Sequence, residues 1–186
     1  MSAFPVHTLA SAPEGSRPSL EALQSAFGFL PNVAGAMAAS PVLAGSLVAL
    51  FGQVHGGSFS EPQIQVLLLT NAVTNAAGWA VAFHSALALA QGLPPEDVDA
   101  IRSGRVPGDP ALAALSRLAR ALIETRGALA PADRDAFLAV GFTPGHLLEV
   151  IAVSAASTIT NYTANVAQPP LEPRFADHGW PVPGRR

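Results

Sequence analysis

The chain has no cysteine among its 186 residues. Without a thiol it cannot form a disulfide, offer a thiolate to a metal, or carry out thiol redox chemistry of its own. Charged residues are also scarce, at 12%, which is about half their share in average soluble proteins. Because 49% of the residues are hydrophobic, we expect subunits to bury part of this apolar surface against one another in a homo-oligomer.

Features of nucleic-acid-binding and membrane proteins are missing as well. The net charge is −3, and no cluster of basic residues precedes the last two positions, so the sequence offers no electrostatic surface for nucleic acid. The amino terminus has no basic segment followed by an apolar one, and the apolar stretch 41–54 is too short to cross a bilayer. We therefore expect no membrane association and a cytoplasmic protein.

Motifs for metals and cofactors are absent too. The five histidines are scattered and show neither an H-x3-H nor an H-E-x-x-H spacing. The glycines do not assemble into a phosphate-binding loop. The sequence therefore predicts no metal site and no cofactor.

The chain does contain repeated signals for helix starts. Ser40-Pro41, Asp109-Pro110 and Thr143-Pro144 each place a capping side chain before a proline in the first helical position. Ser60 and Gln63 have the spacing of a capping box, and no segment alternates with the period of a strand. The sequence predicts an all-α fold of eight or nine helices, near residues 19–27, 32–39, 41–55, 61–74, 77–91, 95–103, 110–126, 131–140 and 144–166.

The helical segments form one predicted domain, residues 19–167. It lies between an extended N-terminal tail, 1–18, and a proline-rich C-terminal tail, 168–186. Segments 64–73 and 80–90 are apolar nearly all round, which is typical of helices in the centre of a domain.

The segment NAAGWAVAFH, residues 75–84, has the spacing of a thiol active site from which the thiols are missing. A C-x-x-C pair followed four residues later by histidine places two sulfurs and an imidazole on one face of a helix. In this chain the two sulfur positions are Ala77 and Ala80, and the imidazole belongs to His84.

This segment resembles the AhpD-like family, also called the carboxymuconolactone decarboxylase family, whose redox members carry E-x11-C-x-x-C-x3-H. Counting back twelve positions from Ala77 places Gln65 at the family's glutamate. The resemblance continues through segments 27–33, 85–93 and 147–153 and covers about residues 20–170. It implies an AhpD-like helical bundle, a peroxidase-related activity, and assembly into trimers or hexamers, with dimers as a further option.

The active-site residues depart from the family pattern at all functional positions except His84. In the redox members, the glutamate and the histidine form a relay that removes a proton from a thiol, and the thiolate then attacks a peroxide or a disulfide. With Gln65, Ala77 and Ala80 in place of the relay carboxylate and the sulfurs, we expect this chain not to be a thiol peroxidase. An engineered Cys-to-Ala form would also explain the alanines, but the additional loss of charge at Gln65 favours natural divergence.

The resemblance implies a small, mostly apolar pocket at this degenerate site, lined by His84, Gln65, Trp79, Ala77 and Ala80. Further candidates for ligand binding are His55, at the end of an apolar helix, and Asn161, in a polar patch of the last helix. Structural roles compete with these assignments. His84 could be a core histidine bonded to Gln65, Trp79 could be ordinary packing, and His55 could interact with a helix dipole.

Two alternative functions remain open from the sequence. One is a cysteine-free acid/base enzyme of the decarboxylase type, in which His84 exchanges a proton with a small lactone or carboxylic acid. That reaction needs His84 to titrate near neutrality and a cation for the carboxylate, yet no lysine or arginine lies between Gln65 and Leu93. The other is a non-catalytic oligomeric binding or scaffold protein. A ligand-sized cavity with His84 at its wall would favour binding or catalysis, and a filled core would favour a scaffold.

Overall fold

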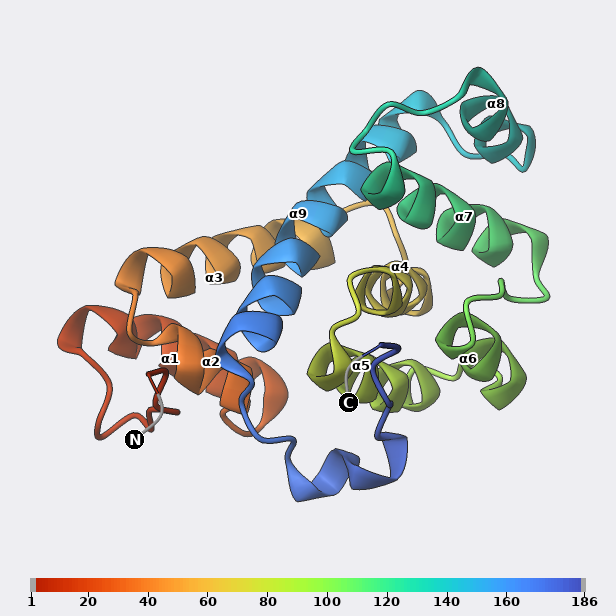
Figure 1. Ribbon diagram of the computed structural model, residues 1–186. Helices are drawn as coiled ribbons and strands as arrows, with labels where there is room; N and C mark the ends of the chain where they lie inside the picture. The colour runs from red at the N-terminus through yellow and green to blue at the C-terminus, as the bar shows by residue number, and fades with distance from the viewer. Residues whose placement is uncertain (1–2, 185–186) are drawn as a thin grey trace.

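The computed structural model describes residues 3–184, which form α-helices and short 3-10 turns and contain no strand (Figure 1). The predicted all-α class is confirmed, and each predicted helix agrees with an observed one to within two residues at either end. The helices are α1 (Arg17–Phe27), α2 (Asn32–Met37), α3 (Pro41–His55), α4 (Glu61–Thr74), α5 (Gly78–Ala90), α6 (Pro95–Arg102), α7 (Pro110–Glu124), α8 (Pro131–Ala139) and α9 (Pro144–Ala167). Two 3-10 turns, η1 (Glu14–Ser16) and η2 (Pro173–His178), lie outside them.

The capping residues explain why the first residues of the helices could be predicted from the sequence. The Ser40 hydroxyl accepts from the Leu43 amide at 3.3 Å, and Asp109 accepts from the Leu112 amide at 2.9 Å. Capping boxes form at the starts of α4 and α9. Each contact satisfies an amide that the helix itself leaves without a partner, and a cap of this kind is worth about 1 kcal/mol.

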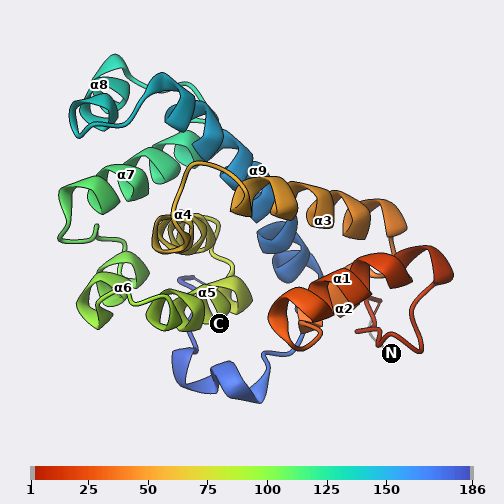
Figure 2. The same cartoon turned by 180° about the vertical axis from the view of Figure 1, so that it is seen from behind.

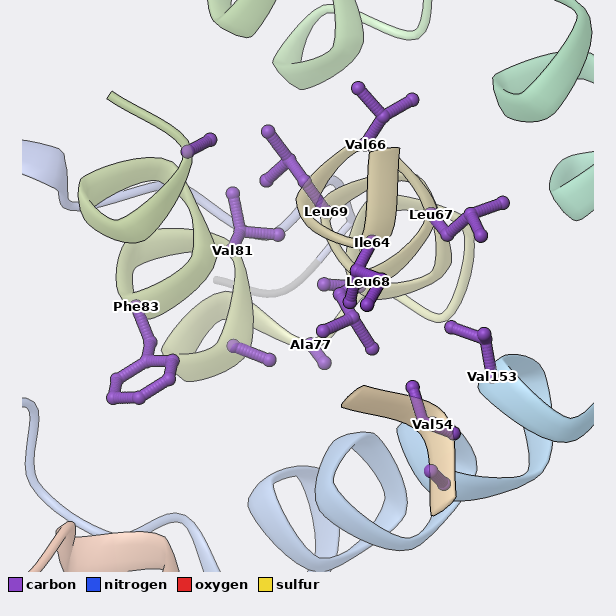
Figure 3. Packing of buried hydrophobic residues seen from close by; sticks show 14 of the residues in the cluster. Val54, Ile64, Val66, Leu67, Leu68, Leu69, Ala77, Val81, Phe83 and Val153 are labelled. Carbon is purple, nitrogen blue, oxygen red and sulfur yellow. The ribbon is translucent and has the colours of Figure 1, made fainter. Parts of the chain in front are cut away.

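Helix α4 lies at the centre of the molecule, as its apolar sequence predicted. It contacts α5, α6, α7 and α9, and the long helix α9 runs across the molecule with α3 on one side and α7 on the other (Figures 1 and 2). The buried side chains of α4 and α5 form the middle of the hydrophobic core (Figure 3). The degenerate motif therefore lies in the interior.

A tight turn joins α4 to α5 and sets their register. Ala76 has a φ of 50°, in the left-handed region that costs a residue with a Cβ atom about 1 kcal/mol. The Ala77 amide donates to the Ala72 carbonyl at 2.9 Å, and Ala77 is the N-cap of α5. This reversal packs α5 back along α4, so residues 19 positions apart, Gln65 and His84, come into contact.

The segment after α9 folds back on its own chain. It contains η2, which packs against α5, and the Arg102 side chain donates to the carbonyls of His178 and Gly179, each at 2.9 Å. Trp180 Nε1 in turn donates to the Arg102 carbonyl at 3.1 Å. Residues 1–2 and 185–186 of the two predicted tails lie outside the described residues.

Within residues 3–184, no single helix has both the length and the hydropathy of a membrane span. Helices α8 and α9 meet the criterion only as a pair, and the chain bends by 111° between them.

Candidate functional site

The structure buries all four family positions in the core. Ala77, the N-cap of α5, and Ala80 within α5 are fully buried, and Figure 3 shows Ala77 inside the cluster of hydrophobic side chains. Gln65 on α4 and His84 on α5 are also buried, and His84 Nδ1 donates to Gln65 Oε1 at 3.1 Å. A neutral amide thus contacts the imidazole, and methyl groups stand at the two positions where the motif would carry sulfur.

Burial dominates the electrostatics of His84. Desolvation of the ring, with a smaller contribution from the nearby His55, lowers the pKa of His84 to about 3. The imidazole is therefore neutral at neutral pH, with its proton on Nδ1 and its lone pair on Nε2. Its one ring proton is engaged with Gln65 Oε1 and the neutral ring is a weak base, which argues against the titration near neutrality that an acid/base role of His84 requires.

The space beside His84 is too small for an organic ligand. A cavity of about 20 Å³ is lined by His84, Trp79, Phe83 and Thr160 together with neighbouring apolar residues, and we call it the His84 cavity. This volume suits about one water molecule. Gln65, Ala77 and Ala80 do not line it.

Trp79 combines packing with a hydrogen bond that the sequence did not reveal. Its ring stacks on Phe83 with the centroids 4.9 Å apart, and its Nε1 donates to Glu172 Oε2 at 2.9 Å. Glu172 Oε1 accepts from the Asn32 amide at 2.6 Å. Because Glu172 comes from the C-terminal segment, 93 residues away from Trp79, no local spacing pointed to it.

Asn161 is buried in α9 and lines neither the His84 cavity nor the larger pocket described next. Its Nδ2 donates to Ser157 Oγ at 3.0 Å, and its Oδ1 is buried without a hydrogen-bond partner among residues 3–184.

A ligand-sized pocket lies next to the His84 cavity. We call it the His55 pocket; its volume is about 460 Å³. Leu23, Phe27 and Phe51 line both spaces and so form the partition between them. The lining of the His55 pocket comprises Ala22, Leu23, Ala26, Phe27, Val48, Phe51, Gly52, His55, Glu61, Gln65, Leu87 and Gln91.

A carboxylate–imidazole pair lies at the polar side of this pocket. His55 Nδ1 and Glu61 Oε1 are 2.8 Å apart, and the His55 ring lies 4.6 Å from the ring of Phe51. The other ring nitrogen, Nε2, is buried and has no hydrogen-bond partner within residues 3–184. Sequence reasoning considered His55 but missed Glu61, although a glutamate six residues on, at the start of the next helix, was a usable signal.

Across residues 3–184, no three side chains of His, Cys, Asp or Glu gather closely enough to hold a metal ion.

Comparisons with known proteins identify the fold. No family model matches the sequence, and no curated protein matches it significantly. Among solved structures, a peroxidase-related protein with an alkylhydroperoxidase AhpD core from Ralstonia eutropha JMP134 superposes with a TM-score of 0.81, at 21% identity, over 94% of each chain.

Two further solved structures share this fold. The debrominase Bmp8, solved as a cysteine-to-alanine variant in complex with 2,3,4-tribromopyrrole, has a TM-score of 0.79 at 17% identity over 96% of each chain. A peroxidase-related protein from Silicibacter sp. TM1040 has a TM-score of 0.73 at 17% identity, covering 96% of this chain and 93% of its own. The chain therefore has the AhpD-like fold of peroxidase-related proteins.

Proposed function

We propose that this protein performs no thiol redox chemistry and binds a small, uncharged, mostly apolar molecule in the His55 pocket. The observation that carries the proposal is the contrast between the two spaces. The His84 cavity, at about 20 Å³, has no room for an organic molecule, whereas the His55 pocket, at about 460 Å³, has the size of ordinary ligand sites. The absence of cysteine supports the first part of the proposal.

The lining of the pocket favours an uncharged ligand. Seven of its residues are apolar, and its polar members are His55, Glu61, Gln65 and Gln91. The lining residues include no arginine, and the sequence contains no lysine. A carboxylic acid, one of the substrates considered for the decarboxylase alternative, would face the Glu61 carboxylate without an arginine or lysine in the lining to offset the repulsion.

One structural neighbour supports the same class of ligand. The debrominase Bmp8 was solved in complex with 2,3,4-tribromopyrrole. That molecule is a small apolar ring with a single N–H donor. For this chain we infer a ligand of the same kind: a compact aromatic or heteroaromatic ring with one polar hydrogen.

Filling the pocket from Gly52 is expected to abolish ligand binding. A Cβ atom added to Gly52 would meet nothing within 4 Å, so the first atom of a new side chain is unobstructed, and Gly52→Phe adds a ring at the pocket wall. We expect this variant to weaken the binding of indole by about tenfold or more. Isothermal titration calorimetry measures the dissociation constant.

The matched control is Gly52→Ala, which leaves the volume nearly intact and adds helix propensity worth about 0.5–1 kcal/mol. It should bind indole as the unaltered protein does. Indole binding that is equally strong in Gly52→Phe, or absent from the unaltered protein, would contradict the proposed function.

We also infer a homo-oligomer that assembles through α9. The large exposed apolar residues of this helix are Leu148, Ile151, Tyr162 and Val166, and the helical period places all four on one stripe. Glu149 is the only acidic residue of α9, and the helix contains no arginine. A subunit interface would remove this stripe from water.

Charge on the α9 stripe is expected to dissociate the assembly. The double change Ile151→Glu and Tyr162→Glu should convert the oligomer into monomers of 19.0 kDa, because each subunit would place carboxylates in an apolar contact. Size-exclusion chromatography with light scattering reports the mass. Ala132→Glu, on the exposed side of α8, is the control that should leave the mass unchanged. A monomeric unaltered protein would refute the inferred assembly.

A further inference from the structure

We propose that Gln65 selects the ligand of the His55 pocket by donating a hydrogen bond from its side-chain amide to a carbonyl oxygen of that ligand. The ligand class is then a neutral lactam fused to an aromatic ring, in which the carbonyl stands beside an N–H group. The inference rests on the proposed function, since it requires a ligand in this pocket. It adds a hydrogen-bond acceptor to the single polar hydrogen of the proposed ligand.

The two polar atoms of the Gln65 amide have different surroundings. Its oxygen, Oε1, accepts from His84 Nδ1 at 3.1 Å, which holds the side chain in place. This is the only side-chain hydrogen bond of Gln65 within residues 3–184, so Nε2 has no partner there. An amide nitrogen carries two hydrogens and can only donate. The group that Gln65 has left to offer is therefore a donor.

Gln65 Nε2 faces the His55 pocket. Among the side-chain nitrogen and oxygen atoms of residues 3–184, those that are both fully enclosed and unpartnered belong to His55, Asn71 and Asn161. Gln65 Nε2 is unpartnered without being one of them, so it keeps surface that another molecule can reach. The residue as a whole is only 3% exposed, and it lines the His55 pocket but not the His84 cavity. The accessible surface of the amide therefore opens into the His55 pocket.

The walls around this donor are mostly apolar and suit a flat ring. Phe27 and Phe51 line the pocket with their rings edge to face and their centroids 5.8 Å apart. Leu23 and Leu87 belong to the same lining. In an apolar pocket a few polar groups fix the orientation of the ligand, so the Gln65 amide selects a ring that carries an acceptor.

Glu61 presents an acceptor one helical turn from this donor. It precedes Gln65 by four positions on α4, so the two side chains lie on the same face with their Cβ atoms about 5–6 Å apart. Glu61 Oε1 is 2.8 Å from His55 Nδ1. Its side chain is 42% exposed and lines the pocket, so Oε2, which has no hydrogen bond within residues 3–184, remains open to a ligand. A lactam matches this pair because its carbonyl and its N–H stand side by side.

Oxindole and indole are matched probes of the Gln65 donor, since oxindole has the frame and the N–H of indole with a carbonyl beside the nitrogen. We expect the unaltered protein to bind oxindole about fivefold or more tighter than indole, the effect of one added hydrogen bond. Isothermal titration calorimetry measures both dissociation constants. This comparison of two ligands tests the donor even where a variant fails to fold.

Gln65→Glu replaces the donor with an oxygen and keeps an acceptor for His84 Nδ1. This variant should still bind indole but should bind oxindole more weakly than indole, because the ligand carbonyl then meets a carboxylate. Gln91→Glu is the matched control, since it makes the same change at another amide of the pocket lining. It should keep the preference for oxindole. Loss of the preference in Gln91→Glu would assign the donor to Gln91 and overturn the inference.

The contact with Glu61 is tested with 2-indanone, in which a methylene group replaces the N–H of oxindole. The unaltered protein should bind 2-indanone about fivefold or more weakly than oxindole, and Glu61→Ala should remove this difference. Equal binding of the two ligands by the unaltered protein would contradict a lactam as the ligand class.

Indole binding separates failure of this inference from failure of the proposed function. If Gly52→Phe blocks indole, but the unaltered protein binds indole and oxindole equally or Gln65→Glu keeps the preference for oxindole, the pocket stands and Gln65 is not its donor. If indole does not bind at all, the pocket itself is wrongly assigned.

Discussion

Dithiol-dependent peroxide reduction is expected to appear in the triple variant Ala77→Cys, Ala80→Cys, Gln65→Glu, at a rate about 100-fold or more above the variant with the two cysteines alone. The two alanines occupy the sulfur positions of the motif, and Gln65 already contacts His84 at 3.1 Å. A glutamate there would stabilise protonated His84 and raise its pKa, so that the pair could take a proton from the thiol. Cysteines beside the neutral Gln65–His84 pair lack this base.

Reduction of tert-butyl hydroperoxide with dithiothreitol as the donor measures this rate. The single change Gln65→Glu, without thiols, is the control and should remain inactive. Equal activity of the double and triple variants would show that the amide suffices and would favour an engineered origin of the alanines. Peroxide reduction by the unaltered protein would overturn the proposal that it lacks thiol-type redox activity.

Acidification from pH 6.5 to pH 3 is expected to remove about 4 kcal/mol of folding free energy through His84. The unfolded chain binds a proton at this histidine near its ordinary pKa of 6.5, whereas the folded chain binds it only near 3. Between these values the unfolded state holds more protons, so stability rises with pH. The stability is complete above pH 6.5 and is lost progressively as the pH falls towards 3.

Urea denaturation at a series of pH values between 7 and 4 measures this slope. In His84→Gln the residue cannot titrate, so the variant should be less stable at neutral pH and should lose less stability on acidification than the unaltered protein. The difference between the two slopes isolates His84 from the carboxylates that titrate in the same range. Parallel slopes would mean that His84 is protonated in the folded state and is less desolvated than its burial indicates.

Helix boundaries and the central position of α4 and α5 were predictable because their causes are local. A capping side chain at Ser40 or Asp109 bonds to an amide three residues away, and a proline beside it fixes the backbone angle. The apolar surface of α4 likewise shows in the sequence itself. The Gln65–His84 contact was predictable only through the family spacing, which encodes the hairpin between two helices.

The positions and volumes of the cavities around these residues were not predictable from the sequence. The sequence indicated one pocket around His84, but the aromatic side chains of Phe27, Phe51 and Phe83 meet there and fill it, with ring centroids 5.4–5.8 Å from the ring of Phe27. The larger volume lies beyond this partition, where His55 and Glu61 meet across a turn. Packing of side chains from α1, α3 and α5 decides such volumes, and no single segment contains that information.

The sequence by itself determined what chemistry is missing, because a side chain without sulfur cannot carry electrons however it is placed. It also determined where the helices begin and end, since those signals act over three or four residues. Only the tertiary structure decided how each histidine is solvated and which side chains it contacts. His84 lies among apolar side chains that suppress its protonation, and His55 lies at an open pocket beside a carboxylate. The two differ in solvation and in partners from distant segments, which only the packed chain defines.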